Sequence, residues 1–387
     1  MRKLVLIAGL LASVAATPVL SFETRARAAY VYDQTTGTVL LSKNAEESLP
    51  PASMSKLMTL FMTFEALGDG RLTLDEKLPV SAHAMSYGGS TMFLDTTDRV
   101  KVEDLIRGVI VLSGNDACAV LAEALSPDGT EAGFARMMTE RGRQIGLENS
   151  TFANSNGWPA AGHRMSMKDL VTLANHLMQD FPQYYPLFSQ KVFEFDGREP
   201  QNKYNRNPLL NLGIGADGLK TGHTEEAGYG LVGSAKQSDR RIVFAMSGLP
   251  SQQARAEEAE RIVTWAFRQF AERHIAAPEA PLATAKVWMG NETTVDLVAA
   301  EDVKLLLPVL AGNDIPAEVI YDSPIEAPIQ KGQAVAELVL RPEGLPERRL
   351  PLVASSSVDR AGFVGRVRTA AQVLLRQLGE QAEAAAN

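Results

Sequence analysis

The segment Ser53-Met54-Ser55-Lys56 places a hydroxyl and an amine at a spacing that suits nucleophilic catalysis. In a helix that begins at Ser53, Lys56 lies one turn later on the same face, within reach of the hydroxyl. A serine hydroxyl is a weak nucleophile at neutral pH and needs a base to take its proton. Lysine serves as that base when burial or nearby positive charge lowers its pKa. The spacing alone is weak, because S-x-x-K arises by chance about once in a chain of this size.

Two further motifs follow along the chain. Ser113-Gly114-Asn115 lies between two predicted helices, where these residue types also suit a C-cap followed by an N-cap. In a functional role, Ser113 would move a proton and Asn115 would contact a substrate through its amide. Ser42-Lys43-Asn44 fits the same loose pattern, but it precedes Ser53 and follows a strand, so we set it aside.

Lys220-Thr221-Gly222 stands just before a strand pattern that starts at Gly228. On a strand, Lys220 and Thr221 could hold a substrate carboxylate, and Gly222 would let the substrate backbone approach closely. The alternative is a surface strand with a polar turn. S-x-x-K, a Ser-x-Asn element and K-T-G in this order form the signature of penicillin-binding proteins and class A β-lactamases. Their joint occurrence favours the functional interpretation of all three.

The chain resembles low-molecular-mass penicillin-binding proteins of the D-alanyl-D-alanine carboxypeptidase type over residues 29–270. The similarity extends around each motif, through residues 51–59, 113–118 and 220–229. Ser-Gly-Asn in place of Ser-Asp-Asn favours this group over class A β-lactamases. No E-x-x-L-N element, which supplies a deacylating glutamate in those enzymes, lies between Ser113 and Lys220.

The resemblance implies a role for each catalytic residue. Ser53 would attack the carbonyl of a D-Ala-D-Ala bond and form an acyl-enzyme, with Lys56 as the general base. Ser113 and Lys220 would relay the proton towards the leaving D-alanine. β-Lactam antibiotics would acylate Ser53 by mimicking the same dipeptide.

The resemblance also implies a set of binding residues. Asn115 would bind the substrate amide, and Thr221 with Arg255 would bind the terminal carboxylate. The backbone N–H groups of Ser53 and His223 would form the oxyanion hole, and Arg206 would lie near the site. Residues 87–90 (Tyr-Gly-Gly-Ser) form an ordinary turn or else an edge of the pocket.

The elements that must position these residues alternate between strand and helix patterns. Residues 30–41 predict a β-hairpin, and residues 228–235 and 241–247 predict two adjacent strands. Between them, apolar residues at spacings of three and four predict helices over 54–67, 102–112, 116–125, 131–145 and 167–178, and a further helix follows over 252–272. The fold class is therefore α+β, an antiparallel sheet covered by helices. By resemblance it is the penicillin-binding and serine β-lactamase-like fold, over residues 22–275.

A second, small all-β domain is predicted over residues 282–356. Pro278 and Pro281 indicate a linker, and short β-type runs at 286–288, 294–298, 318–321 and 334–340 are separated by turn residues.

Both ends of the chain have targeting patterns. Arg2 and Lys3 precede an apolar run over residues 4–16, which indicates a signal peptide over residues 1–21 and an exported, periplasmic protein. The alternative is an uncleaved membrane anchor. Val364, Leu374 and Leu378 belong to an amphipathic stripe within residues 360–387, which could lie in a membrane interface or pack on the β domain.

Composition and absent motifs exclude several other classes of function. A net charge of −8 argues against a nucleic-acid partner. Cys118 is the single cysteine, and the five histidines include no H-E-x-x-H pair, so we expect neither a metal site nor a cofactor. No G-x-S-x-G elbow is present, which excludes an α/β-hydrolase serine. The open alternatives are a D,D-endopeptidase of the same fold that cuts peptidoglycan cross-links and a cell-wall scaffold protein without turnover.

Overall fold

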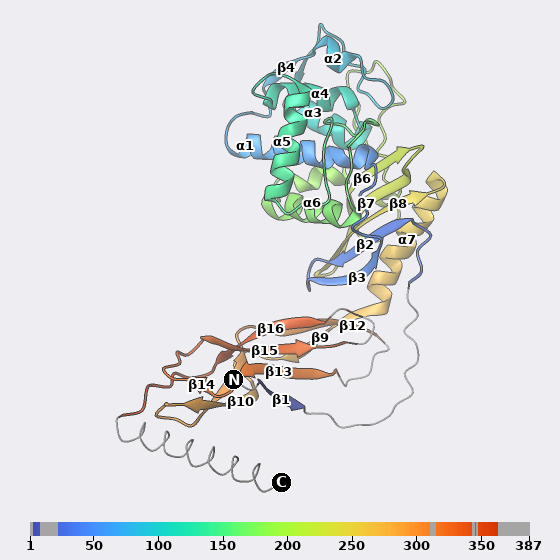
Figure 1. Cartoon of the computed structure of the whole chain (residues 1–387). Helices are drawn as coiled ribbons and strands as arrows, with labels where there is room; N and C mark the ends of the chain where they lie inside the picture. The colour runs from blue at the N-terminus through green and yellow to red at the C-terminus, as the bar shows by residue number, and fades with distance from the viewer. Residues whose placement is uncertain (1–2, 8–21, 310–314, 343–344, 346, 363–387) are drawn as a thin grey trace. The chain divides into compact units, whose positions relative to one another are not determined.

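The computed structural model describes residues 3–7, 22–309, 315–342, 345 and 347–362 (Figure 1). Their contacts divide the chain into two compact units, Phe22–Arg268 and a second one formed by Met1–Ser21 with Gln269–Asn387. All three sequence motifs fall in the first unit.

A five-stranded antiparallel sheet forms the centre of the first unit. Its strands are β2 (Ala28–Asp33), β3 (Thr38–Lys43), β6 (Ala216–Thr224), β7 (Gly228–Gln237) and β8 (Arg240–Leu249), in the order β3-β2-β8-β7-β6. The predicted hairpin and the two predicted adjacent strands are therefore confirmed. The Lys220-Thr221-Gly222 motif lies on β6, an edge strand.

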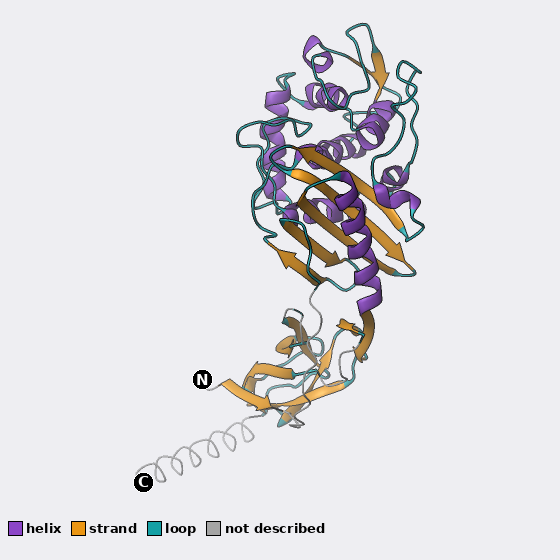
Figure 2. Ribbon diagram, turned by 90° about the vertical axis from the view of Figure 1, so that its right-hand side faces the viewer, coloured by secondary structure: helices purple, strands orange, loops and turns teal. Residues whose placement is uncertain are grey.

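Helices cover both faces of this sheet, as Figure 2 shows. Helix α7 (Gln252–Gln269) lies across one face. The helical part inserted between β3 and β6 lies on the other, and its α6 (Met167–Asp180) packs on β2 and β8. The inserted part also contains α1 (Lys56–Gly68), α2 (Ala82–Met85), α3 (Val102–Arg107), α4 (Asn115–Leu125), α5 (Glu131–Gln144), the small strands β4 (Lys77–Pro79) and β5 (Arg99–Lys101), and the short turns η1 (Ala52–Ser55), η2 (Gly108–Leu112), η3 (Tyr185–Ser189) and η4 (Pro208–Asn211).

Helix α1 is the central element of the helical core. It contacts α4, α5 and α6, and its Leu57, Leu60 and Phe64 are completely buried. Each buried side chain of this size stabilises the fold by about 1.5–3 kcal/mol. Since α1 continues directly from η1, this packing fixes the segment that carries Ser53 and Lys56.

The second unit is all-β in its described residues. A seven-stranded sheet has the order β1-β13-β15-β16-β11-β10-β14, and β9 pairs with β12. The strands are β1 (Lys3–Ile7), β9 (Phe270–Ala276), β10 (Pro281–Trp288), β11 (Thr294–Ala299), β12 (Val303–Pro308), β13 (Ala317–Asp322), β14 (Ile325–Glu326), β15 (Ala334–Leu340) and β16 (Arg348–Ala354). Its own apolar core includes Leu297, Leu338 and Leu352.

One predicted helix is too long. The helix expected over residues 252–272 ends at Gln269, and the next residues form β9, which pairs with β12 along its whole length. This pairing joins segments far apart in the sequence, and it overrides the local helical pattern.

The predictions for the two termini fall mostly outside the described residues. Of the signal segment, the backbone of Lys3–Ile7 is described, as a strand paired with β13, and residues 8–21 are not. The C-terminal amphipathic segment beyond residue 362 is also outside. Across the part of the chain that is described, no helix has the length and apolar character needed to cross a bilayer.

Candidate active site

The candidate nucleophile Ser53 lies in η1, and Lys56 is the first residue of α1. Ala52, just before Ser53, has a φ of 49°, in the left-handed region that costs energy for a residue with a side chain. Lys56 Nζ lies 2.9 Å from Ser53 Oγ, so the structure brings together the hydroxyl and amine of the S-x-x-K motif.

The Lys56 amine is completely buried, and among the described residues it meets three oxygen atoms. Besides Ser53 Oγ, these are Asn115 Oδ1 at 2.7 Å and the Asn156 carbonyl oxygen at 2.5 Å. The latter two can only accept hydrogen bonds, whereas the Ser53 hydroxyl can also donate. A neutral Lys56 can therefore donate to Asn115 and Asn156 and keep its lone pair for the Ser53 proton. Burial lowers the pKa of Lys56 to about 8, which makes this neutral form accessible.

Ser113 and Lys220 form a second hydroxyl–amine pair. Ser113 ends η2 with a φ of 63°, and Asn115 begins α4. Lys220 Nζ donates to Ser113 Oγ at 2.9 Å and to the Thr221 carbonyl oxygen at 3.3 Å. Burial lowers the pKa of Lys220 well below its ordinary value, and the positive charges of Lys56 and Arg206 lower it further.

Gly222 packs closely against the turn that carries Ser53. A Cβ at this position would lie 2.9 Å from the Pro51 carbonyl oxygen, 3.0 Å from Met54 Cγ and 3.1 Å from Ala52 Cβ. The missing side chain therefore makes room for η1 against β6. This close approach sets the K-T-G strand beside the nucleophile.

A cavity of about 540 Å³ opens at this junction. Ser53, Asn115 and His223 line it, whereas Lys56 and Lys220 are buried behind its wall. Gly89 and Ser90 also line it, so the segment 87–90 edges the pocket, the second of the two interpretations offered for it. The exposed Trp158 also lines the cavity, beside Gly89.

The two predicted arginines lie near the site but are not among the described residues that line the cavity. Arg255 is 6% exposed and its guanidinium lies over Tyr229, whose ring stacks on His223 at 3.9 Å. Arg255 Nε has no hydrogen-bond partner among the described residues. Arg206 donates to Ser90 Oγ at the pocket edge.

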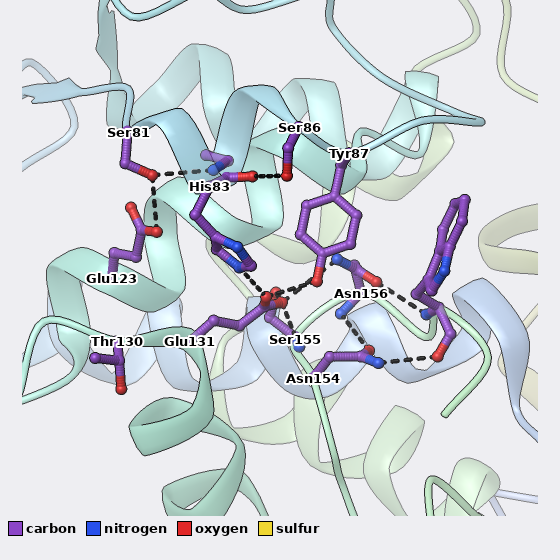
Figure 3. A network of polar contacts seen from close by, with 12 residues as sticks. Ser81, His83, Ser86, Tyr87, Glu123, Thr130, Glu131, Asn154, Ser155 and Asn156 are labelled. Atoms are coloured by element: carbon purple, nitrogen blue, oxygen red, sulfur yellow. Dashed lines mark hydrogen bonds and ion pairs between the residues drawn. The ribbon is translucent and has the colours of Figure 1, made fainter. Parts of the chain in front are cut away.

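The sequence did not predict the residues that supply and hold the third oxygen atom around the Lys56 amine, the Asn156 carbonyl oxygen. Asn156 belongs to a loop at residues 154–158, in which the Asn154 and Asn156 side chains bond to backbone groups of the same loop. Ser155 and Asn156 also donate to Glu131, a buried carboxylate at the start of α5 (Figure 3). The available signal was the Asn-Ser-Asn-Gly composition of residues 154–157, which is typical of a tight turn. That composition gives no indication that the turn reaches a catalytic amine.

The fold and the paired Ser–Lys groups are those of a penicillin-binding serine peptidase. A family model described as D-alanyl-D-alanine carboxypeptidase matches residues 12–249, and one described as the C-terminal domain of penicillin-binding protein 5 matches residues 270–360. The chain therefore belongs to the D-alanyl-D-alanine carboxypeptidase family.

Individual relatives agree with this assignment. The D-alanyl-D-alanine carboxypeptidase DacC of Escherichia coli (strain K12) is 35% identical over 351 residues, covering 88% of this chain and 86% of DacC. DacF of Bacillus subtilis (strain 168), with the same description, is 32% identical and covers 88% of this chain and 87% of its own. The crystal structure of penicillin binding protein 5 from Haemophilus influenzae matches with a TM-score of 0.75 and 30% identity, over 89% of this chain and 100% of that one.

Proposed function

We propose that this protein is a serine D-alanyl-D-alanine carboxypeptidase that removes the terminal D-alanine from peptidoglycan stem pentapeptides. The observation that carries the proposal is the 2.9 Å contact between Ser53 Oγ and the buried Lys56 amine, beside a cavity that Ser53 lines. The relatives named as carboxypeptidases support the same substrate.

In this reaction Ser53 Oγ attacks the carbonyl carbon of the penultimate D-alanine while Lys56 takes the hydroxyl proton. The backbone N–H groups of Ser53 and His223 stabilise the resulting oxyanion, an effect of about 3 kcal/mol for one donor in related chemistry. The C–N bond then breaks, and Ser113 with Lys220 delivers a proton to the leaving nitrogen, so D-alanine departs. A water molecule hydrolyses the ester and returns the Ser53 hydroxyl.

Binding of the substrate is assigned to groups around the cavity. Asn115 contacts the peptide amide, while Thr221 and Arg255 hold the terminal carboxylate. The buried guanidinium of Arg255 supports this role, because its Nε lacks a partner among the described residues and a carboxylate would supply one. β-Lactams would acylate Ser53 in the same pocket.

The proposal is tested with a fluorescent penicillin and a pentapeptide that ends in D-Ala-D-Ala. Wild type and Ser53→Ala are compared for covalent label and for free D-alanine. We expect both signals in wild type and neither in the variant. Label without D-alanine release would favour the endopeptidase or the scaffold without turnover, and an unlabelled wild type would contradict the proposal.

We also propose that the protein is exported and held at the outer face of the cytoplasmic membrane through residues 360–387. The support is the basic and apolar pattern at the N-terminus and the amphipathic stripe at the C-terminus. Deleting residues 365–387 should move the protein from the membrane fraction to the soluble fraction. Unchanged partitioning would contradict the membrane attachment.

A further inference from the structure

The loop at residues 154–158 supplies one of the oxygen atoms that bind Lys56, yet it belongs to neither a helix nor a strand. Thr59 of α1 donates to the Ser155 carbonyl oxygen at 2.5 Å, and Asn154 Oδ1 accepts from Gly157 N at 2.8 Å. A Cβ on Gly157 would lie 1.9 Å from the Ala52 carbonyl oxygen, so the loop also packs directly on η1. The position of the Asn156 carbonyl is thus fixed by whatever holds this loop.

Glu131 is a second group that holds the loop, through Ser155 (Figure 3). Its Oε1 accepts from Ser155 N at 2.9 Å, from Ser155 Oγ at 2.5 Å and from Asn156 Nδ2 at 3.4 Å. Its Oε2 accepts from Tyr87 Oη at 2.6 Å and lies 2.7 Å from His83 Nε2. One carboxylate therefore ties the loop that carries Asn156 to the segment that edges the pocket.

The carboxylate of Glu131 is ionised in this environment. Burial alone would raise the pKa of Glu131, but hydrogen bonds from Ser155, Tyr87 and His83 outweigh it and hold the pKa below its ordinary value. Hydrogen bonds to an ionised acceptor are about twice as strong as neutral ones. Glu131 also begins α5, where the helix dipole favours negative charge.

We propose that Glu131 is a positioning residue for acylation, which holds the 154–158 loop so that the Asn156 carbonyl fixes the Lys56 amine against Ser53. Its side chain forms no hydrogen bond with Ser53 or Lys56 in the described structure, so it positions the Lys56 amine through Asn156. The inference rests on the proposed function, because it concerns the same acylation step. Its physical basis is that a small displacement of a catalytic group can lower the rate about a hundredfold.

Two variants separate the reach of this side chain from its charge. Glu131→Asp keeps the charge but shortens the side chain by one methylene, so the carboxylate cannot span from Ser155 to Tyr87. Glu131→Gln keeps the length and an acceptor oxygen for Ser155 but removes the charge. The matched control is Glu123→Asp, since Glu123 is a carboxylate on the neighbouring α4 that accepts from Ser81 Oγ and, among the described residues, forms no hydrogen bond with the loop.

The experiment uses the full chain and a fluorescent penicillin, and it resolves the rate constant of acylation from the dissociation constant of the prior complex. We expect Glu131→Asp to lower the rate constant about 10- to 100-fold with little change in the dissociation constant. Glu131→Gln keeps the reach but loses the stronger hydrogen bonds of an ionised acceptor, so its loss should be smaller than that of Glu131→Asp, and Glu123→Asp should match wild type. Melting temperatures of all variants show whether each protein is folded.

Each outcome decides the inference. An unchanged acylation rate in folded Glu131→Asp would overturn it, and so would a large loss in Glu131→Gln with none in Glu131→Asp, which would assign the effect to charge. Loss of label in Glu123→Asp would overturn it too, because the effect would then lack specificity for the loop. A labelled wild type establishes the proposed function independently, while an unlabelled wild type overturns both.

Discussion

Lys56 combines the position of a general base with surroundings that favour its neutral form. Two carboxylates lie close enough to act on it, but both are engaged elsewhere. Asp116 accepts hydrogen bonds from the backbone N–H groups of Met92 and Leu94, and Glu131 accepts from Ser155. Neither forms an ion pair with Lys56 in the described structure, so burial remains the main influence on its pKa.

The rate of acylation should therefore follow the ionisation of Lys56. Below its pKa of about 8 the amine is protonated and cannot accept the Ser53 proton, so the rate should fall about tenfold for each unit of pH below that value. Above it the rate should level off. The charged or titratable groups that act on Lys56 include Cys118 and Asp116 of α4, Glu131 of α5, His163, Arg206, and Lys220 of β6.

The measurement is the second-order rate constant for labelling by a fluorescent penicillin from about pH 6 to about pH 10. A control is the Lys43→Met variant. Lys43 lies on β3, at the edge of the sheet opposite β6, and donates to the Thr24 carbonyl oxygen. The profile of this variant should match that of wild type. A rate independent of pH across this range would show that Lys56 is not the base.

At the scale of the elements, the site depends on how closely β6, β7 and the 154–158 loop approach η1. A glycine lies at each contact. A Cβ on Gly222, Gly230 or Gly157 would come within 3.0 Å of an atom of Pro51, Met54 or Ala52, respectively. Three separate parts of the chain thus pack against the turn that carries Ser53, and this packing holds the strained Ala52 backbone in place.

Gly222→Ala should therefore both destabilise the fold and slow acylation. The added methyl group must displace the Pro51 carbonyl or the Met54 side chain, and overpacking of this kind costs about 1–3 kcal/mol. Thermal unfolding and the labelling rate are measured together. Gly68→Ala is the control, because a Cβ at Gly68 meets no atom within 4 Å. A Gly222→Ala protein with wild-type stability and labelling would contradict the prediction, because β6 could then move away from η1 without loss of stability or activity.

The local motifs and most elements could be predicted from the sequence, because their signals are short in range. The Lys56 partner of Ser53 follows from helical spacing, and the hairpin and most helices follow from apolar periodicity. Contacts between segments far apart in the sequence have no such local pattern, so they could not be predicted. Glu131 reads as an ordinary first-turn residue of α5, and only the folded chain brings it to Ser155. The end of α7 was missed for the same reason, since β9 is defined by its pairing with β12.

At the scale of the whole molecule, the chemistry belongs to one of two separately packed units. Each unit has its own apolar core, and Ser53, Lys56, Ser113 and Lys220 all lie within Phe22–Arg268. A unit of this length buries most of the surface that its unfolded chain exposes, which is sufficient for independent folding. The second unit supplies none of the described residues that line the cavity.

A protein that consists of Phe22–Arg268 should accordingly fold and acylate without the β unit. Its labelling rate with a fluorescent penicillin should lie within about threefold of the rate for the full chain, because the cavity and both lysines are retained. The truncated Ser53→Ala protein is the control for label that does not depend on the nucleophile. If the truncated protein has a cooperative unfolding transition but labels more than about tenfold slower, the β unit must influence the site. If it fails to fold, the catalytic unit needs residues outside Phe22–Arg268 to fold, and the prediction is wrong.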